Sequence, residues 1–177
     1  MLRQSLLFLS LVGIGLSGCN QHPARGPQPK EVVISAAGEI GSRLPEFFVK
    51  DLRGRDISSA DLRGKVVLID FWATWCQPCK KEMPGYQELL NRYGPSGFAV
   101  IGLKLDTMRD TEEPVLFARK IGVSYPLAVA GDDLKQRFGG IQGLPTTMLY
   151  DRQGILRKKV IGFEYTSAFE SALTPLL

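Results

Sequence analysis

The sequence predicts an α/β domain with a mixed central sheet and helices on both faces, and two observations carry this prediction. Residues 65–72 and 98–106 are nearly continuous apolar runs of β-forming residues, as central strands buried on both faces require. Segments with helical patterns follow these runs, and strands that alternate with helices form a sheet covered on both sides. At 177 residues and 44% hydrophobic, the chain is long enough for one compact domain.

Three elements are expected in the first half of the domain. Residues 47–58 form an expected hairpin, because apolar residues flank a turn at Arg53 and Gly54. The first buried strand follows, and a helix is expected from about residue 76 to 93. Pro84 lies inside that helix and predicts a kink, because proline removes a backbone donor and crowds the preceding turn.

The second half of the domain continues the alternation. A strand is expected at 98–106, a helix at 111–121, a short strand at 125–130 and a short helix at 132–138. Two strands at 146–150 and 155–161 are expected to flank a turn at 151–154, and a final helix is expected to end near residue 176. Pro114 is tolerated only in the first turn of its helix, and Gly122 and Gly139 suit helix ends. Ser167 and Glu170 have the spacing of a capping box, which predicts where the final helix begins.

The first 18 residues have the pattern of an export signal. A positive charge precedes an apolar run at 6–16, which is too short for a spanning helix of roughly 20 residues. The "LSGC" that ends at Cys19 resembles the lipobox of bacterial lipoproteins, in which the cysteine becomes the lipidated first residue; the alternative is an ordinary signal peptide. We expect residues 19–38 to be a lipidated, flexible linker. Residues 39–177 would be a domain anchored by lipid to the bacterial cell envelope, facing the periplasm or extracytoplasmic space.

The charge of the chain indicates a solvated surface. Its formal net charge of +4 is spread along the sequence, without the run of basic and aromatic residues that is typical of nucleic-acid binding. We therefore expect no nucleic-acid partner. A single compact basic domain makes a monomer the default expectation.

Two cysteines, Cys76 and Cys79, lie two residues apart in "WCQPC", a spacing that allows a metal half-site, a structural staple or a redox switch. A bridge across so short a loop removes little chain entropy, so stability is a poor reason for it. A zinc or copper site would need further sulfur or imidazole ligands, yet the only histidine, His22, lies in the expected linker. We therefore expect no metal site.

The stretch "FWATWCQPCK", with Pro84 downstream and "GLPTT" at 143–147, resembles the thioredoxin superfamily, in which CxxC accompanies a strand–helix pattern. The similarity is closer to the TlpA/ResA-like branch of membrane-tethered, exported thioredoxin-like proteins and covers residues 39–177. It implies a thioredoxin-like three-layer fold with an N-terminal β-hairpin and a strand–helix insertion within 102–138. It also implies the activity of a thiol–disulfide oxidoreductase.

The resemblance further implies the partners of the protein. Its substrates would be protein disulfides, such as the haem-attachment cysteines of apocytochrome c or the copper-site cysteines of a respiratory oxidase. Its electrons would come from a membrane thiol transporter. No dissociable cofactor is expected, because the cysteine pair itself carries two electrons.

Cys76 is the expected nucleophile. If it lies just before the first turn of a helix, unpaired backbone donors and the helix dipole stabilise its thiolate, and Lys80 and Lys81 add to the field. Cys79, one helical turn later on the same side, is the expected resolving cysteine. It would displace the reduced substrate from the mixed disulfide and leave Cys76 bonded to Cys79.

Two carboxyl groups are candidates for proton transfer. The resemblance implies that Asp70, six residues before Cys76, accepts the proton of the resolving cysteine, and that Glu82, six residues after Cys76, has a related role. The presence of both is a departure, because many TlpA-like proteins lack the aspartate. A carboxyl group in an apolar strand should have a raised pKa, as a base near neutral pH requires. For Glu82, an exposed helix position is a nearly equal alternative.

Five residues are expected to contact the substrate: Trp75, Gln77, Pro78, Leu144 and Pro145. The resemblance implies that Pro145 is cis and that its loop offers backbone groups to the substrate; the alternative is a trans proline that ends a loop. Pro78 is explained equally well as a helix starter, because the first positions of a helix accept proline. Trp75 is assigned a supporting role, in covering the cysteine pair and shaping the docking surface.

Three other functions stay open at this point. The same fold donates disulfides when its reduced form is over-stabilised, and the reduction potential distinguishes the two directions. A peroxiredoxin-like thiol peroxidase shares the fold, but the paired cysteines, without a threonine and proline pattern ahead of a single cysteine, argue against it. A non-enzymatic metal chaperone is disfavoured by the lack of histidine in the domain.

Overall fold

The computed structural model describes residues 36–105, 109–110 and 112–177. The expected signal peptide, Cys19 and nearly all of the expected linker lie outside the described residues, as do the expected strand end at Asp106 and the expected helix start at Thr111. In the part of the chain that is described, no helix is long and apolar enough to cross a membrane.

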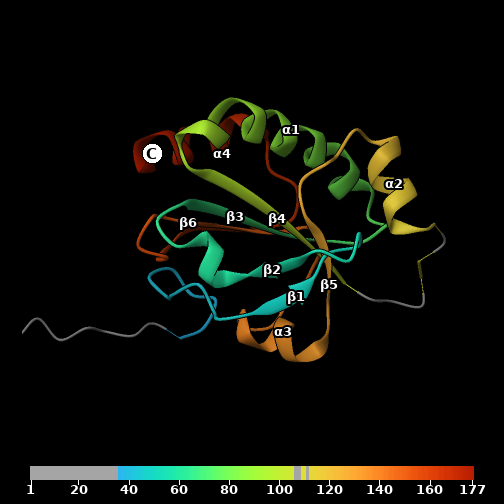
Figure 1. The fold of residues 1–177 in the computed structure, drawn as a ribbon, viewed down its shortest axis with the longest axis horizontal. Helices are drawn as coiled ribbons and strands as arrows, with labels where there is room; N and C mark the ends of the chain where they lie inside the picture. Colours follow the sequence, from blue (N-terminus) through green and yellow to red (C-terminus); the bar gives the residue numbers. More distant parts are fainter. Residues whose placement is uncertain (1–35, 106–108, 111) are drawn as a thin grey trace, which may run out of the picture. The chain divides into compact units, whose positions relative to one another are not determined.

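A five-stranded mixed sheet forms the centre of the domain, with its strands in the order β5-β4-β3-β6-β7 (Figure 1). Its parallel half consists of β3 (Val66–Trp72), β4 (Phe98–Leu105) and β5 (Leu127–Ala130). Its antiparallel half continues from β3 through β6 (Thr146–Tyr150) to β7 (Leu156–Ile161). The mixed sheet predicted from the alternating pattern is therefore confirmed.

Helices cover both faces of this sheet, as predicted (Figure 1). One face is covered by α1 (Gln77–Tyr93), α2 (Pro114–Lys120) and α4 (Thr166–Leu173). The other face is covered by α3 (Asp132–Arg137), by a hairpin of β1 (Phe48–Lys50) and β2 (Asp56–Ser58), and by a 3-10 helix at Ser59–Leu62.

The N-terminal hairpin covers part of one sheet edge. It turns at Arg53 and Gly54, as predicted, and Gly54 has a positive φ of 80° that favours glycine. The Leu52 N–H donates a hydrogen bond of 2.7 Å to the carbonyl of Leu127 in the edge strand β5. An edge strand that is partly covered in this way exposes fewer unpaired backbone groups.

The central strand β3 divides the core into two parts. All seven of its residues are buried, because strands pack against it on both sides and helices cover both faces. Leu68 and Trp72 point to the side of α1, whereas Ile69 and Phe71 point to the side of α3. By the same alternation Asp70 lies on the α1 side, within the core.

The helix predicted at 111–121 begins later, at Pro114. Proline disfavours the helical conformation in the residue before it, so Glu113 adopts an extended conformation and caps the helix instead. Its carboxylate accepts hydrogen bonds from the N–H groups of Val115 and Leu116 at 3.0 and 2.8 Å. Pro114 therefore occupies the first helical position, where the sequence predicted that it is tolerated.

The capping box predicted at Ser167 and Glu170 is wrong. Helix α4 begins at Thr166 and has no side-chain cap, and a 3-10 turn follows its end at Leu173. The carboxylate of Glu170 instead pairs with Arg92 and accepts a hydrogen bond of 2.7 Å from the Tyr93 hydroxyl, both at the end of α1. The Glu170 side chain, which the local spacing assigned to a helix cap, therefore contacts the neighbouring helix α1 instead.

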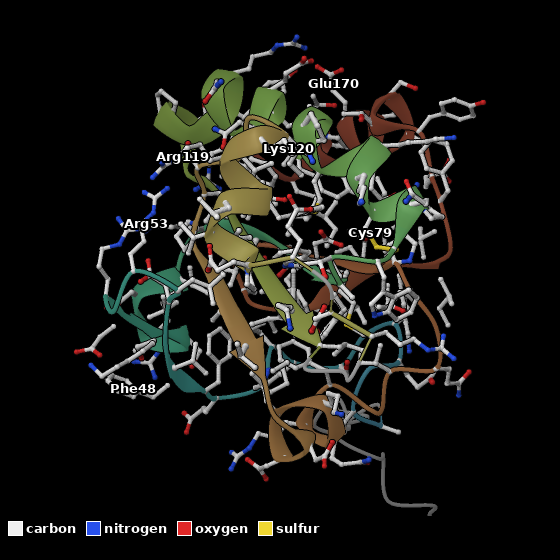
Figure 2. The ribbon with its side chains drawn as sticks, turned by 90° about the vertical axis from the view of Figure 1, so that its right-hand side faces the viewer. Phe48, Arg53, Cys79, Arg119, Lys120 and Glu170 are labelled. Atoms are coloured by element: carbon white, nitrogen blue, oxygen red, sulfur yellow. A yellow bond between two sulfur atoms is a disulfide. The ribbon has the colours of Figure 1, made fainter. Side chains whose placement is uncertain are left out.

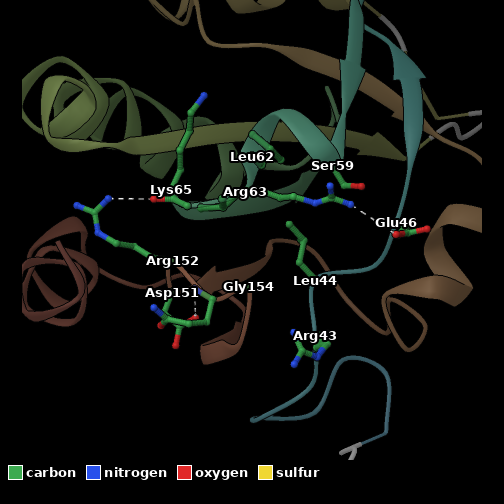
Figure 3. Close-up of a pocket in the computed structure, with 13 residues that line it drawn as sticks. Arg43, Leu44, Glu46, Ser59, Leu62, Arg63, Lys65, Asp151, Arg152 and Gly154 are labelled. Carbon is green, nitrogen blue, oxygen red and sulfur yellow. Dashed lines mark hydrogen bonds and ion pairs between the residues drawn. The ribbon is translucent and has the colours of Figure 1, made fainter.

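A hollow of about 290 Å³ lies at the end of the sheet where β3 begins, and its lining includes several basic side chains (Figure 3). Arg152 donates hydrogen bonds to the backbone carbonyls of Gly64 and Ser96, at 2.9 and 2.8 Å, and to Leu177. Arg152 therefore links Leu177 to the loops that contain Gly64 and Ser96, and its guanidinium stabilises the fold.

Helices α1 and α4 approach closely at Gly85. A Cβ at this position would lie 2.1 Å from Thr166 Oγ1 and 3.0 Å from Thr166 Cβ. We expect Gly85→Ala to lower the free energy of unfolding by about 1–3 kcal/mol, because overpacking outweighs the gain of about 1 kcal/mol in helix propensity. The matched control is Gly94→Ala, whose Cβ would meet only Leu90 at 3.6 Å. Urea unfolding measures both, and a Gly85→Ala protein as stable as the control contradicts this account.

Candidate active site

The two cysteines form a disulfide bond at the amino-terminal end of α1, directly after the loop that follows β3 (Figure 2). Their Cα atoms are 5.3 Å apart, within the range that a disulfide requires. Both residues are buried, Cys76 at 3% exposure and Cys79 at 0%. The geometry is therefore that of the disulfide which the resemblance to the thioredoxin superfamily implied.

Cys76 caps helix α1 with its sulfur atom. Its Sγ accepts a hydrogen bond of 3.3 Å from the N–H of Cys79, and its extended backbone is typical of an N-cap. A thiolate at this position is stabilised by the first-turn N–H groups and by the helix dipole. Gln77 and Pro78 occupy the first two helical positions and are exposed at the rim of the pair.

The loop before the cysteines is fixed by a network that the sequence did not predict. Thr74 donates a hydrogen bond of 2.6 Å to Asp110, whose other oxygen pairs with the buried ammonium of Lys104. The guanidinium of Arg109 lies 5.4 Å from the centre of the half-buried Trp75 ring. The chain after β4 therefore holds the tryptophan that precedes Cys76 in place.

Asp70 is fully buried beneath α1, as the sequence predicted. One carboxyl oxygen accepts a hydrogen bond of 3.4 Å from Thr147, and the other has no hydrogen-bond partner in the described structure. Burial raises the pKa of Asp70 from 3.8 to about 7, and the hydrogen bond from Thr147 offsets only part of this shift. The group therefore changes its charge near neutral pH.

Glu82 is also buried, at 1% exposure, so the alternative of an exposed helix position is wrong. It belongs to the inner stripe of α1, in which Cys79, Glu82, Tyr86 and Leu89 follow at helical spacing. Burial, together with the nearby negative charge of Asp70, raises the pKa of Glu82 to about 8. One of its oxygens accepts a hydrogen bond of 3.4 Å from the N–H of Glu164, and the other has no hydrogen-bond partner among the described residues.

Two hydroxyl groups accompany the buried carboxyl groups, and the sequence did not predict them. The hydroxyl oxygens of Tyr86 and Thr147 are 3.2 Å apart, and Thr147 also donates to Asp70. The available signals were the spacing of Tyr86, four residues after Glu82, and the "PTT" that places Thr147 two residues after Pro145. Thr147 comes into contact with Asp70 because the two face each other across β3 and β6.

The peptide bond between Leu144 and Pro145 is cis, as the resemblance implied. Pro145 is buried, and its carbonyl accepts a hydrogen bond of 2.8 Å from the N–H of Gly162. Leu144 packs against both core clusters. The cis-proline loop is thereby joined to the loop between β7 and α4, which also reaches Glu82 through Glu164.

No metal-binding cluster is formed by the described residues: nowhere do three His, Cys, Asp or Glu side chains come together in a way that could hold an ion. The chemistry that the site supports rests on the two sulfur atoms and the two buried carboxyl groups.

The raised pKa of Asp70 makes stability depend on pH. Between pH 4 and 7 the folded protein keeps a proton that the unfolded chain releases, so the free energy of unfolding falls as the pH rises. We expect Asp70→Asn to gain stability relative to the wild type from pH 4 to pH 8, by at most about 4 kcal/mol. Urea unfolding of the oxidised proteins measures this gain.

The control for this experiment is Asp132→Asn. Asp132 is exposed, and its pKa is lowered by Lys135, so its replacement should produce no such gain at high pH. If the difference in free energy of unfolding between the wild type and Asp70→Asn is the same at pH 4 and at pH 8, Asp70 does not titrate in the folded protein.

Comparisons with known proteins agree with this site. Residues 40–159 match the sequence model of the AhpC/TSA family. The chain is 37% identical over 139 residues to the thiol-disulfide oxidoreductase ResA of Bacillus thuringiensis, covering 76% of this chain and 77% of ResA. It is 30% identical over 155 residues to the thioredoxin-like protein YneN of Bacillus subtilis, covering 87% and 86% of the two chains.

Solved structures show the same relationship. A crystal structure of a thiol:disulfide interchange protein of the thioredoxin family from Chlorobium tepidum aligns with a TM-score of 0.69 and 26% identity, covering 79% of this chain and 99% of that one. The fold, the close cysteine pair and these relatives agree. The chain therefore belongs to the AhpC/TSA family within the thioredoxin superfamily, and it is a ResA-like thiol–disulfide oxidoreductase.

Proposed function

We propose that this oxidoreductase reduces disulfide bonds of other proteins outside the cytoplasm. The observation that carries the proposal is the asymmetry of the cysteine pair. The Cys76 sulfur caps α1, where a thiolate is stabilised, whereas Cys79 is fully buried on the side of the helix that carries Glu82. This asymmetry suits one attacking and one resolving cysteine.

The first half of the reaction uses Cys76. Its thiolate attacks one sulfur of the substrate disulfide, the substrate S–S bond breaks, and one substrate cysteine leaves as a thiolate. The product is a mixed disulfide between Cys76 and the remaining substrate sulfur. Gln77 and Pro78 border this sulfur from the first turn of α1, and we assign them to the substrate contact together with Trp75, Leu144 and Pro145.

The second half uses Cys79, which must lose a proton before it can attack. A buried thiol has a raised pKa, so it needs a base nearby. We assign this role to Asp70, with Glu82 as the second carboxyl group of the same buried site. The Cys79 thiolate then bonds to the Cys76 sulfur, the mixed disulfide breaks, and the second substrate thiolate leaves; two electrons have passed to the substrate.

We place this activity on the far side of the inner membrane, with Cys19 as a lipid anchor after removal of residues 1–18. The apolar run at residues 6–16 and the "LSGC" motif that follows it support this placement. The electron donor would be a membrane thiol transporter. The substrates would be cysteine pairs of the kind that hold haem in apocytochrome c or copper in a respiratory oxidase.

The charges around the pair favour a reductant over a donor of disulfides. A strong oxidant over-stabilises its reduced, thiolate form. Here Asp70, with a pKa of about 7, is partly ionised at neutral pH on the α1 side of the sheet, and this negative charge opposes a Cys79 thiolate. The Lys80 ammonium, which the sequence predicted to stabilise the thiolate, lies 5.3 Å from the centre of the Phe117 ring of α2.

We therefore expect a reduction potential near that of thioredoxin, about −270 mV. The measurement uses the chain with Cys19→Ser, so that only one cysteine pair reacts, equilibrated in dithiothreitol or glutathione buffers. Alkylation of the free thiols reports the reduced fraction. A potential near about −120 mV would reverse the proposed direction of electron flow.

Replacement of Asp70 tests the second half of the reaction. We expect Asp70→Asn to slow release of substrate from the Cys76 mixed disulfide by about tenfold or more, because Cys79 loses its proton acceptor. Rapid mixing of the reduced protein with a peptide disulfide separates attack from release. Glu82→Gln serves for comparison and should slow release less. An unchanged release rate in Asp70→Asn would remove Asp70 from this role.

A further inference from the structure

A hollow of about 450 Å³ lies beside the redox pair and is lined by Pro78 and Lys81 of α1 and by Phe163 and Tyr165 of the loop between β7 and α4. Pro78 stands between the two cysteines in the sequence, so the hollow lies against the helical turn that follows Cys76. An extended chain advances about 3.3–3.6 Å per residue. The residues next to a cysteine bonded to Cys76 are therefore within reach of the hollow.

The aromatic lining of this hollow faces solvent. The rings of Phe163 and Tyr165 meet edge to face, with their centres 5.2 Å apart, and they are 45% and 70% exposed. Ile161, at the end of β7, is 52% exposed as well. Large exposed apolar side chains that gather beside a reactive group are typical of a surface that a partner covers, and aromatic residues are enriched at such interfaces.

The loop that carries the aromatic rings is held in place from within. The N–H of Gly162 donates to the Pro145 carbonyl at 2.8 Å, and the N–H of Glu164 donates to Glu82 at 3.4 Å. Both anchors belong to the candidate active site. A surface that is fixed before binding loses less conformational entropy when its partner arrives.

The charge at the rim of the hollow is unbalanced. Lys81 is exposed and forms no ion pair with any residue that the structure describes. Glu164, the acidic residue of this loop, already accepts a hydrogen bond of 3.0 Å from the Tyr165 N–H and lies 3.8 Å from the ammonium of Lys158. A carboxylate supplied by a partner would therefore complement Lys81.

We infer that this hollow is a specificity pocket for the substrate polypeptide: it receives a bulky apolar side chain, preferably aromatic, next to the target cysteine, while Lys81 pairs with a carboxylate of the same segment. The inference rests on the proposed function, because its occupant is the segment that flanks the disulfide attacked by Cys76. It adds the chemistry of the substrate sequence, which the cysteine pair alone does not specify.

Short peptides test the inference directly. Each contains one cysteine as a disulfide with thionitrobenzoate, which leaves as a coloured thiolate when Cys76 attacks the peptide sulfur. One neighbour of the cysteine is tryptophan or glycine, and the other neighbour is glutamate or lysine. Each combination is made twice, with the two neighbours exchanged. The reduced chain with Cys19→Ser should react about fivefold faster with the tryptophan peptide than with the glycine peptide, as burial of one aromatic side chain implies.

Variants of the pocket identify the source of this preference. In Tyr165→Ala, and more fully when Phe163→Ala is added, the ratio of the tryptophan rate to the glycine rate should fall to about one. In Lys81→Glu, the preference for glutamate over lysine should reverse. The matched control is Phe48→Ala, because Phe48 is 67% exposed and lies away from the disulfide (Figure 2); it should keep the wild-type ratios.

Three results would overturn the inference. The first is equal rates for all peptides in the wild type, and the second is an unchanged ratio in the Tyr165→Ala protein. The third is concentration-dependent self-association that Tyr165→Ala abolishes while peptide rates stay equal, which would mean that a second copy of the chain covers the hollow. Failure of the wild type to reduce even oxidised glutathione would instead contradict the proposed function itself.

Discussion

The central strand β3 is buried along its whole length, and the redox site depends on that burial. The strand carries Asp70 into an apolar interior on the α1 side and then delivers the chain to the loop before Cys76. An ionised carboxylate there has no water to stabilise it, so its pKa rises to about 7. The environment that makes the strand a good core element therefore also makes its one acidic residue a base near neutral pH.

Helix α1 connects the inside of the domain with its reactive surface. Its amino-terminal end stabilises the Cys76 sulfur, and its inner stripe buries Cys79 and Glu82 against the sheet. Its first two turns also contribute Pro78 and Lys81 to the surface beside the pair. One helix thus places Cys76, Cys79 and Glu82 in fixed relation. Small displacements of the helix would change all three, which explains why its close contact with α4 at Gly85 matters.

Two buried carboxyl groups in one core are costly, and the structure offsets only part of that cost. Thr147 donates to Asp70 and lies within hydrogen-bond distance of the Tyr86 hydroxyl, while the backbone of Glu164 donates to Glu82. One oxygen of each carboxyl group has no hydrogen-bond partner in the described part of the chain. Proteins rarely leave such groups in a core without a use for them, because an unpaired buried polar group costs free energy. The proton transfer that we propose for Asp70 would be such a use.

The sequence by itself determined the alternating elements, the fully buried strand β3 and the pair Cys76 and Cys79 at the start of a helix, because these follow from local periodicity and spacing. The lipidated Cys19 stays a prediction. Only the tertiary structure decided that Glu82 is buried, that Thr147 faces Asp70 across two strands, and that Arg109 lies over the Trp75 ring. Each of these depends on contacts between segments far apart in the chain. The same reason explains why the capping box predicted for α4 is wrong. No pattern within α4 shows that Glu170 pairs with Arg92 of α1.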